Sequence, residues 1–141
     1  MVEYRASFRG TPSSVREART AIVNYAKMCG FSQQETYEIA LASGEALANA
    51  VEHGNKDLGF IAVACAFVDG ELTIDVSDDG PGFDFAHVTK RRRDPDALRG
   101  FGISIMHALM DGVQYEGRGS RVRLRKRRGA AGERTKEAEE A

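Results

Sequence analysis

The segment from Ser32 to His53 constrains the fold of this chain most. Ser32 and Glu35 have the spacing of a capping box, and Gly54-Asn55 is typical of a helix end, so the segment is predicted to be one helix of about six turns. A helix with one apolar side packs that side on the protein core. The apolar side is predicted to consist of Ile39, Ser43, Ala46, Leu47 and Ala50.

The opposite side of this helix carries a narrow polar strip. At 100° per residue, Asn49, Glu52 and His53 all lie within about 80° of Glu45, and Lys56 joins them if the helix extends so far. Such a strip is most often a solvated helix face. Asparagine, however, is a weak helix former that prefers caps, so Asn49 inside the helix also favours a binding role. Both interpretations stay open at this point.

The other hydrophobic patterns predict an α+β fold. Strands are expected at 4–8, 58–68, 72–76, 113–115 and 120–124, with a hairpin turn at Asp69-Gly70. A first helix is expected to start at Thr11-Pro12, with Glu17 near the capping-box offset, and to stop at Gly30; another is expected at 101–110. This order favours a mostly antiparallel mixed sheet with helices packed on one face. Residues 77–100, rich in Gly, Pro, Asp and Arg, are predicted to be a functional lid.

Composition indicates one domain, predicted at 1–125, followed by a flexible charged tail at 126–141. With 42% hydrophobic and 29% charged residues, the chain is not disordered as a whole. The longest apolar run, Phe60–Val68, falls short of the roughly 18 residues that a membrane span needs, and the N-terminus lacks the apolar core of a signal peptide. Cys29 and Cys65 lack metal or redox spacing and are predicted to be small core residues. We therefore expect a cytoplasmic protein that does not bind membranes.

The formal net charge of −1 hides an asymmetry along the chain. Residues 1–89 carry 6 basic and 13 acidic side chains, whereas residues 90–128 carry 12 basic and 4 acidic ones. A basic second half suits nucleic acid or an anionic ligand such as a nucleotide. We do not expect direct binding of nucleic acid, because the basic stretch 118–128 has only Tyr115 at its edge for base stacking.

An acidic, glycine-rich segment follows the strand expected at 72–76. In Asp78-Asp79-Gly80-Pro81-Gly82, the two glycines allow the backbone to approach a ligand closely, and the carboxylate of Asp78 can accept a hydrogen bond from an exocyclic amine. A tight surface turn explains the same pattern. A calcium loop is less consistent with it, because the other oxygen ligands of such a loop are missing.

A second pair of glycines, Gly100 and Gly102, opens the helix expected at 101–110. Free N–H groups at a helix N-terminus suit phosphate oxygens. The segment is neither a dinucleotide fingerprint, since the third glycine and the βαβ context are missing, nor a Walker loop. Basic side chains in and beside the lid can meet phosphate charge or form a solvated basic loop: Arg91, Arg92, Arg93 and Arg99.

The order of these motifs is more specific than any one of them. Glu45-x3-Asn49-x3-His53, Asp78-x-Gly80-x-Gly82, Gly100-x-Gly102 and Gly119-Ser120 follow one another, and this order resembles the Bergerat-fold ATPase superfamily of gyrases, histidine kinases and MutL proteins. The short domain, the segment from Gly44 to Gly54 and Met106-x3-Met110-Asp111 are similar to the bacterial anti-sigma-factor serine/threonine kinases. The resemblance covers about residues 5–125.

The resemblance implies roles for individual residues. Asn49 matches the asparagine that coordinates the Mg²⁺ bridging the phosphates of ATP, and Asp78 matches the carboxylate that reads the adenine amino group. Glu45 matches the acidic residue proposed as general base. Further nucleotide-binding positions implied by the resemblance are His53, Lys56, Gly80, Gly82, Arg99, Gly100, Phe101, Gly102 and Ser120.

The resemblance also implies an activity. Kinases of this kind use ATP and Mg²⁺, are typically homodimers, phosphorylate an anti-anti-sigma protein of the STAS type and sequester a sigma factor. Arg16 and Arg19 lie on one side of the first helix, which in the family lies near the partner-binding surface. Two arginines on an exposed helix face are equally consistent with simple solvation of the helix. The alternative is a nucleotide-dependent partner-binding module without kinase activity. A histidine-kinase catalytic domain is less expected, because no helix with a phosphoacceptor histidine precedes residue 1.

Overall fold

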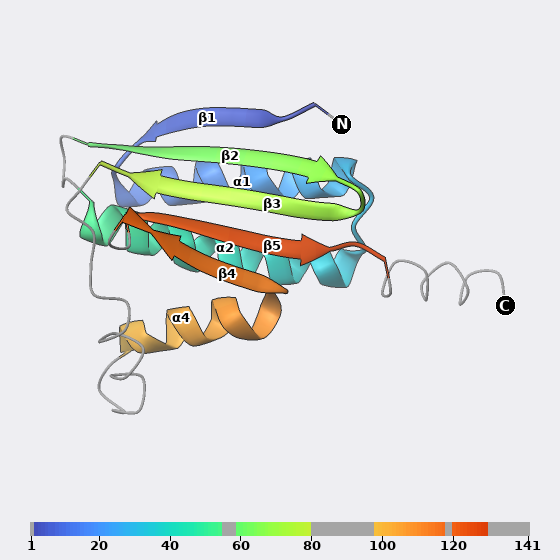
Figure 1. Ribbon diagram of the computed structural model, residues 1–141. Coiled ribbons are helices and arrows are strands. Elements are labelled where there is room, and N and C mark those ends of the chain that lie inside the picture. The colour runs from blue at the N-terminus through green and yellow to red at the C-terminus, as the bar shows by residue number, and fades with distance from the viewer. Residues whose placement is uncertain (1, 55–58, 80–97, 118–119, 130–141) are drawn as a thin grey trace, which may run out of the picture.

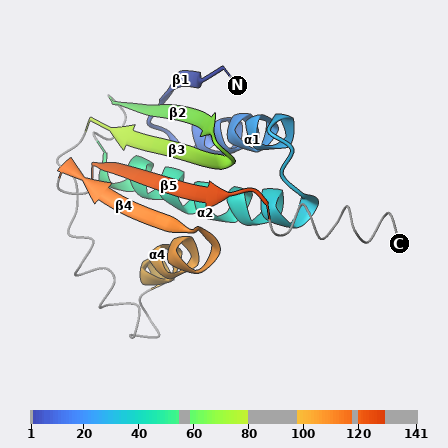
Figure 2. The same cartoon turned by 45° about the vertical axis from the view of Figure 1, so that its right-hand side comes forward.

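A computed structural model of the 141-residue chain describes residues 2–54, 59–79, 98–117 and 120–129. In these residues a five-stranded sheet has the strand order β1-β2-β3-β5-β4, and each pair of neighbouring strands is antiparallel. Helices α1, α2 and α4 lie together on one face of the sheet, as the two views show (Figures 1 and 2). This arrangement confirms the predicted α+β fold with helices on one face, while the predicted lid falls mostly outside the described residues.

The helices and strands follow the predicted order. The chain runs through β1 (Tyr4–Arg9), α1 (Pro12–Met28), α2 (Gln33–His53), β2 (Phe60–Val68), β3 (Glu71–Asp78), α4 (Leu98–Leu109), β4 (Gly112–Glu116) and β5 (Arg121–Arg127).

The start of α2 forms as the capping-box spacing predicts. The backbone N–H of Glu35 donates to the hydroxyl of Ser32 at 3.1 Å, and the backbone N–H of Ser32 donates to the carboxylate of Glu35 at 2.9 Å. Two N–H groups that a helix cannot satisfy internally are thereby bonded. All of the residues predicted for the apolar side of this helix are buried.

Two other local predictions have different outcomes. The turn between β2 and β3 has positive φ at both central residues, 51° at Asp69 and 79° at Gly70, which is the hairpin geometry favoured by Asp-Gly. The predicted cap at the start of α1 is wrong in detail. The Thr11 side chain makes no capping bond to the helix backbone and lies 3.1 Å from the hydroxyls of Ser13 and Ser14 instead.

Two predicted boundaries also need correction. A tail was expected from residue 126, but β5 continues to Arg127 and Lys126 is only 7% exposed. A lysine carries no apolar signal of a strand, but here its ammonium donates to the half-buried carboxylate of Glu38. Helix α4 begins at Leu98 rather than at residue 101, so Gly100, expected just ahead of the helix, lies within its first turns together with Gly102.

The core lies between the helix layer and the inner face of the sheet. It includes both cysteines, Cys29 and Cys65, which are 3% and 1% exposed, as predicted. Burial raises the pKa of the Cys65 thiol to about 12, so it stays protonated at neutral pH. No helix in the part of the chain that the structure describes has the length and apolar character needed to cross a membrane.

Candidate functional site

A small pocket lies where α2, α4 and the inner face of the sheet meet. Its polar lining residues are Asn49 of α2, Asp78 at the end of β3 and Ser120 just before β5. The structure therefore brings together three residues that the sequence analysis selected from three separate motifs. The remaining lining residues are Tyr115 and the aliphatic side chains of Ala46, Ala50, Val76, Met106 and Val122.

The helical spacing of α2 decides which polar residues reach this pocket. Ala46, Asn49 and Ala50 line it, because residues three and four apart share one side of a helix. Glu45 lies about one turn before Asn49, is half-buried and stands outside the pocket lining. His53 is also half-buried and outside the lining, with its Nε2 3.9 Å from the carboxylate of Glu52.

The ends of two sheet strands hold the other polar side of the pocket. The backbone N–H of Asp78 donates to the carbonyl of Ser120 at 2.9 Å, which joins the end of β3 to the residue before β5. The hydroxyl of Ser120 donates to the carbonyl of Gly117 at 2.7 Å. Gly117 has a φ of 59°, and a Cβ there would lie 2.7 Å from the Ser120 hydroxyl. The turn before β5 therefore requires glycine at this position.

Gly54 lets the end of α2 pack directly against Asp78. A Cβ at Gly54 would lie 2.5 Å from the carbonyl oxygen of Ala50 and 3.3 Å from the Cβ of Asp78. The sequence analysis interpreted Gly54 only as a helix end, because a glycine after a helix carries no sign of what packs against it. The structure adds Gly54 as a residue that shapes the pocket.

Tyr115 is the one aromatic residue in the described lining of this pocket. It stands on the inner face of β4, opposite Val122 of β5. Burial raises its pKa to about 12, so the phenol is neutral at physiological pH. The sequence analysis did not select Tyr115 for this site, because an inward-facing side chain on a strand is indistinguishable from an ordinary core residue.

Several predicted nucleotide-binding residues remain untested by this geometry. Arg99, Gly100, Phe101 and Gly102 belong to the first turns of α4, whose leading N–H groups lack partners within a helix. Their side chains are not described, and three further predicted residues, Lys56, Gly80 and Gly82, lie outside the described residues, as do Arg91, Arg92 and Arg93.

The two arginines predicted to bind a partner are both exposed on α1. Arg19 also reaches across to α2. A Cβ at Gly44 would lie 3.4 Å from both Cδ and Nη1 of Arg19, so the glycine leaves room for this side chain. Since Gly44 is the residue before Glu45, the arginine surface of α1 approaches the predicted catalytic region of α2.

Comparison with known proteins assigns the chain to a family. Residues 8–126 match the model of the histidine kinase-like ATPase domain. The chain is 29% identical over 139 residues to the anti-sigma F factor of Clostridium acetobutylicum, covering 90% of this chain and 96% of that protein. It is 34% identical over 122 residues to the anti-sigma F factor of Clostridium botulinum strain Alaska E43, covering 78% and 83%.

Two further comparisons agree with this assignment. The serine-protein kinase RsbW of Bacillus thuringiensis strain Al Hakam is 29% identical over 105 residues, which cover 68% of this chain and 66% of that protein. A crystal structure of the RsbU and RsbW domains of Rv1364c from Mycobacterium tuberculosis has the same fold, with a TM-score of 0.65 and 21% identity over 91% of this chain and 33% of that chain. The protein therefore belongs to the histidine kinase-like ATPase family, among its anti-sigma-factor kinases.

Proposed function

We propose that this protein is an ATP-dependent serine kinase and anti-sigma factor of a cytoplasmic partner-switching pathway. It phosphorylates an anti-anti-sigma protein of the STAS type in one state and sequesters a sigma factor in the other. The observation that supports this most is the pocket in which Asn49, Asp78 and Ser120 meet, in a chain similar to anti-sigma F factors and RsbW kinases.

The pocket suits the adenine base of ATP. The carboxylate of Asp78 accepts a hydrogen bond from the exocyclic amine, and the hydroxyl of Ser120 lies on the same side of the pocket. The aliphatic walls exclude water around a flat base and strengthen those polar contacts. Guanine carries a carbonyl where adenine carries its amine, so an ionised Asp78 disfavours GTP.

Asn49 would suit a magnesium ion that accompanies ATP. Its amide oxygen is a hard ligand of the type Mg²⁺ prefers, and it lines the pocket opposite the strand ends. The described residues contain no group of three His, Cys, Asp or Glu side chains that would cage a metal. One protein ligand fits Mg²⁺ nevertheless, since this ion keeps several waters and uses phosphate oxygens. Held by Asn49, such an ion would neutralise phosphate charge.

Glu45 is the residue that we propose as general base. Glu45 is half-buried, lies about one helical turn before Asn49 and follows Gly44, which the side chain of Arg19 approaches. From that position it would accept the proton of the incoming serine hydroxyl of the substrate protein while the serine oxygen bonds to the γ-phosphorus of ATP and ADP leaves.

The nucleotide assignment is tested by calorimetric titration with Mg-ATP and Mg-GTP. The Asp78→Asn variant loses a hydrogen bond to a charged acceptor, so its ATP affinity falls by roughly 10- to 100-fold and its preference over GTP shrinks. The matched control is Asp75→Asn, the same change on the opposite face of β3, which leaves ATP affinity unchanged. A wild-type protein that binds no ATP contradicts the proposal.

Kinase activity and mere partner binding are separated by incubation with ATP and candidate STAS proteins. Transfer of labelled phosphate to a serine of the STAS protein supports the kinase. Capture of a sigma factor with ATP bound, but without any phosphate transfer, indicates a partner-binding module instead.

The exposed arginines of α1 are proposed to contact both classes of partner. An electrostatic contact of this kind mainly raises the association rate and depends on salt. The double variant Arg16→Glu with Arg19→Glu therefore impairs capture of both partners and keeps wild-type ATP affinity. Lys27→Glu, an exposed charge reversal in the last turn of the same helix, is the control and leaves capture unchanged. If the double variant captures both partners at low salt as well as wild type does, this assignment is wrong.

The kinase is further proposed to act as a homodimer.

A further inference from the structure

Tyr115 lies at one end of an inward-facing row of side chains that crosses three strands. Val76 of β3 pairs with Val122 of β5, and Val122 pairs with Tyr115 of β4. All three line the pocket, and so does Asp78, which follows Val76 by two residues on the same face of β3. Neighbouring strands lie about 4.8 Å apart, so β3 and β4 are separated by roughly 10 Å. Asp78 and Tyr115 therefore stand on opposite sides of the pocket.

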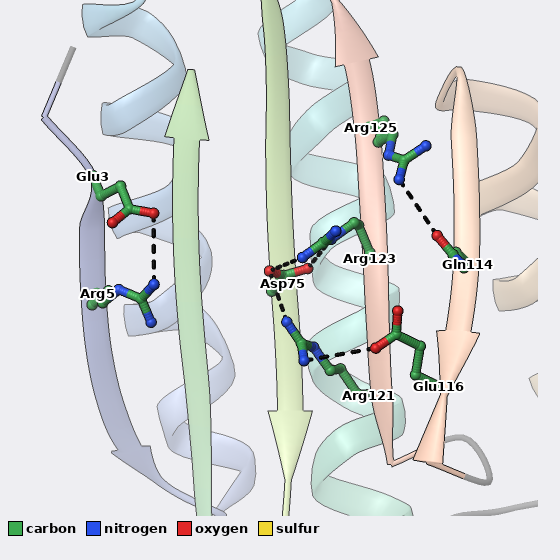
Figure 3. Close-up of polar contacts among 8 residues, drawn as sticks. All are labelled: Glu3, Arg5, Asp75, Gln114, Glu116, Arg121, Arg123 and Arg125. Carbon is green, nitrogen blue, oxygen red and sulfur yellow. Dashed lines mark hydrogen bonds and ion pairs between the residues drawn. The ribbon is translucent and has the colours of Figure 1, made fainter. Parts of the chain in front are cut away.

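Polar contacts on the outer face of the sheet hold these three strands together (Figure 3). Arg123 of β5 donates to Asp75 of β3 at 2.7 and 3.0 Å. Arg121 donates to Asp75 at 3.3 Å and lies 3.6 Å from Glu116 of β4. Burial raises the pKa of Asp75, but the bonds from Arg123 and Arg121 outweigh it and hold the pKa below its ordinary value. We therefore expect the strands under the pocket to keep their spacing.

The same contacts fix the direction of Tyr115. Its two neighbours along β4 face outward, where Glu116 lies beside Arg121 and the amide of Gln114 accepts from Arg125 at 3.4 Å (Figure 3). Because successive side chains of a strand point to opposite faces, Tyr115 points into the pocket. The size of the pocket on this side is therefore determined by the side chain of Tyr115 rather than by the position of the strand.

Tyr115 is the largest side chain in the described lining of this pocket. The cavity has a volume of about 10 Å³, which holds about one water molecule, and a purine base is much larger. A base can therefore enter only if a lining side chain moves. Most of the apolar walls are alanine and valine, whose side chains have little freedom, and Met106 is fully buried. Tyr115 is only partly buried and lies on the edge strand of the sheet, so it is the least confined of these side chains.

We propose that Tyr115 determines which purine bases the pocket accepts, through the bulk of its ring. When Asp78 holds the amine of the base, the ring of Tyr115 limits the space on the opposite side of the pocket. Adenine carries only hydrogen on its carbons C2 and C8, so it needs the least space there. A purine with a substituent on the carbon that faces Tyr115 meets the ring. In a pocket of limited size, one additional methylene group already changes discrimination by about 10- to 200-fold.

This inference rests on the proposed nucleotide site and adds a limit on the size of the base. Asp78 distinguishes bases by the hydrogen bond that their amine donates, whereas Tyr115 distinguishes them by their width. The two residues therefore respond to different analogues of ATP, and the two assignments can fail separately.

The test is calorimetric titration of the full chain with ATP and three analogues: 2-methylthio-ATP, 8-methylthio-ATP and N6-benzyl-ATP. Tyr115→Val shortens the side chain and keeps an apolar residue that suits a strand. Its affinity for one of the methylthio analogues, relative to ATP, is expected to be about tenfold higher than in wild type. N6-benzyl-ATP carries its substituent on the amine beside Asp78, so its relative affinity is expected to show no such gain.

Two controls separate the bulk of the ring from other effects. Tyr115→Phe keeps the ring and removes only the hydroxyl, so it is expected to discriminate against both methylthio analogues as wild type does. Tyr37→Val makes the same truncation at a tyrosine of α2 that is 61% exposed and outside the pocket lining, and it is expected to bind all four nucleotides like wild type. If Tyr115→Val does not fold, Tyr115→Leu leaves a smaller void and carries the same expectation.

The outcomes distinguish this inference from the proposed function. Unchanged relative affinities for both methylthio analogues in the folded valine or leucine variant overturn the inference, and so does an equal gain in Tyr115→Phe. A gain with N6-benzyl-ATP as large as that with the methylthio analogues indicates general loosening of the pocket and overturns it too. In each of these cases ATP still binds, and the proposed nucleotide site stands. Wild-type protein that binds no ATP contradicts the proposed function together with the inference.

Discussion

Two places between the helix layer and the sheet contain polar side chains, and these side chains differ in their surroundings. At the first, the ammonium of Lys126 on β5 donates to Glu38 of α2 at 2.8 Å and to the carbonyl of Leu109 at the end of α4 at 2.6 Å. At the second, about three turns further along α2, Asn49 and Asp78 line a pocket. The side chain of Lys126 is 8% exposed and that of Glu38 is 24% exposed, so the first place is largely covered by the protein.

We interpret the first place as one that stabilises the fold and the second as the candidate functional site. The Lys126 contacts join α2, α4 and β5, and every bond there stays within the chain. The side chains of the second place line a pocket. Removing one partner of an ion pair inside a protein leaves the other charge without a partner and lowers the free energy of unfolding. We therefore expect the first place to be sensitive to the loss of either charged side chain. The second place is where we propose that ATP binds.

The largest effect is expected at the functional end, from Glu45→Gln. Glutamine keeps the size and hydrogen bonding of the side chain but cannot accept the serine proton. Phosphate transfer therefore falls by about 10²-fold or more, while ATP affinity and the free energy of unfolding stay at wild-type values. Single-turnover phosphate transfer measures the first, and calorimetry and urea unfolding measure the others. Glu52→Gln on the same helix is the control, and wild-type transfer in Glu45→Gln excludes this residue as the base.

The opposite pattern is expected from Lys126→Met at the first place. Methionine fills a similar volume but leaves Glu38 without its cation, and losing a hydrogen-bonded charge pair that is partly buried costs about 2–3 kcal/mol of unfolding free energy. Urea unfolding measures the loss. Lys27→Met, at an exposed position of α1, changes stability by less than about 0.5 kcal/mol. If Lys126→Met is as stable as the control, the contact does not hold the three elements together.

A smaller effect that touches both properties is expected from Gly54→Ala. The new Cβ would meet the carbonyl of Ala50 at 2.5 Å, so the end of α2 must move away from Asp78. Overpacking of this kind costs about 1–3 kcal/mol, and we expect roughly tenfold weaker ATP binding in calorimetry. Gly44→Ala is the matched control, because its Cβ would meet only the flexible side chain of Arg19 at 3.4 Å. Equal ATP affinity in both variants would show that the helix end does not position Asp78.

The smallest effect is the response of the first place to acid. The hydrogen bond from Lys126 lowers the pKa of Glu38, so the folded protein holds this proton less tightly than the unfolded chain. The stability that Glu38 contributes is therefore complete above its ordinary value of about 4.5 and is lost as the pH falls through its lower folded pKa. Urea unfolding at pH 7 and pH 3.5 should show a smaller acid loss for Glu38→Gln than for wild type. Asp75, whose pKa is also lowered, accounts for part of the remaining loss.

The candidate site was only partly predictable from the chain. Asn49 and Asp78 were identifiable because each has an unusual setting, an asparagine inside a helix and a carboxylate before two glycines. Tyr115 and Gly54 were not, since an inward tyrosine and a glycine at a helix end have ordinary structural explanations. Gly80 and Gly82 were identifiable from the same motif as Asp78, but both lie outside the described residues.

The sequence by itself determined the features that depend on neighbouring residues. The capping box at Ser32, the hairpin turn at Asp69-Gly70 and the two sides of α2 follow from local hydrogen bonds, backbone sterics and helical spacing. Only the tertiary structure decided that Lys126 is buried, because its partner Glu38 is far away in the chain. It likewise decided that Gly54 packs on Asp78, since contacts between distant segments depend on how whole elements pack and leave no local pattern in the sequence.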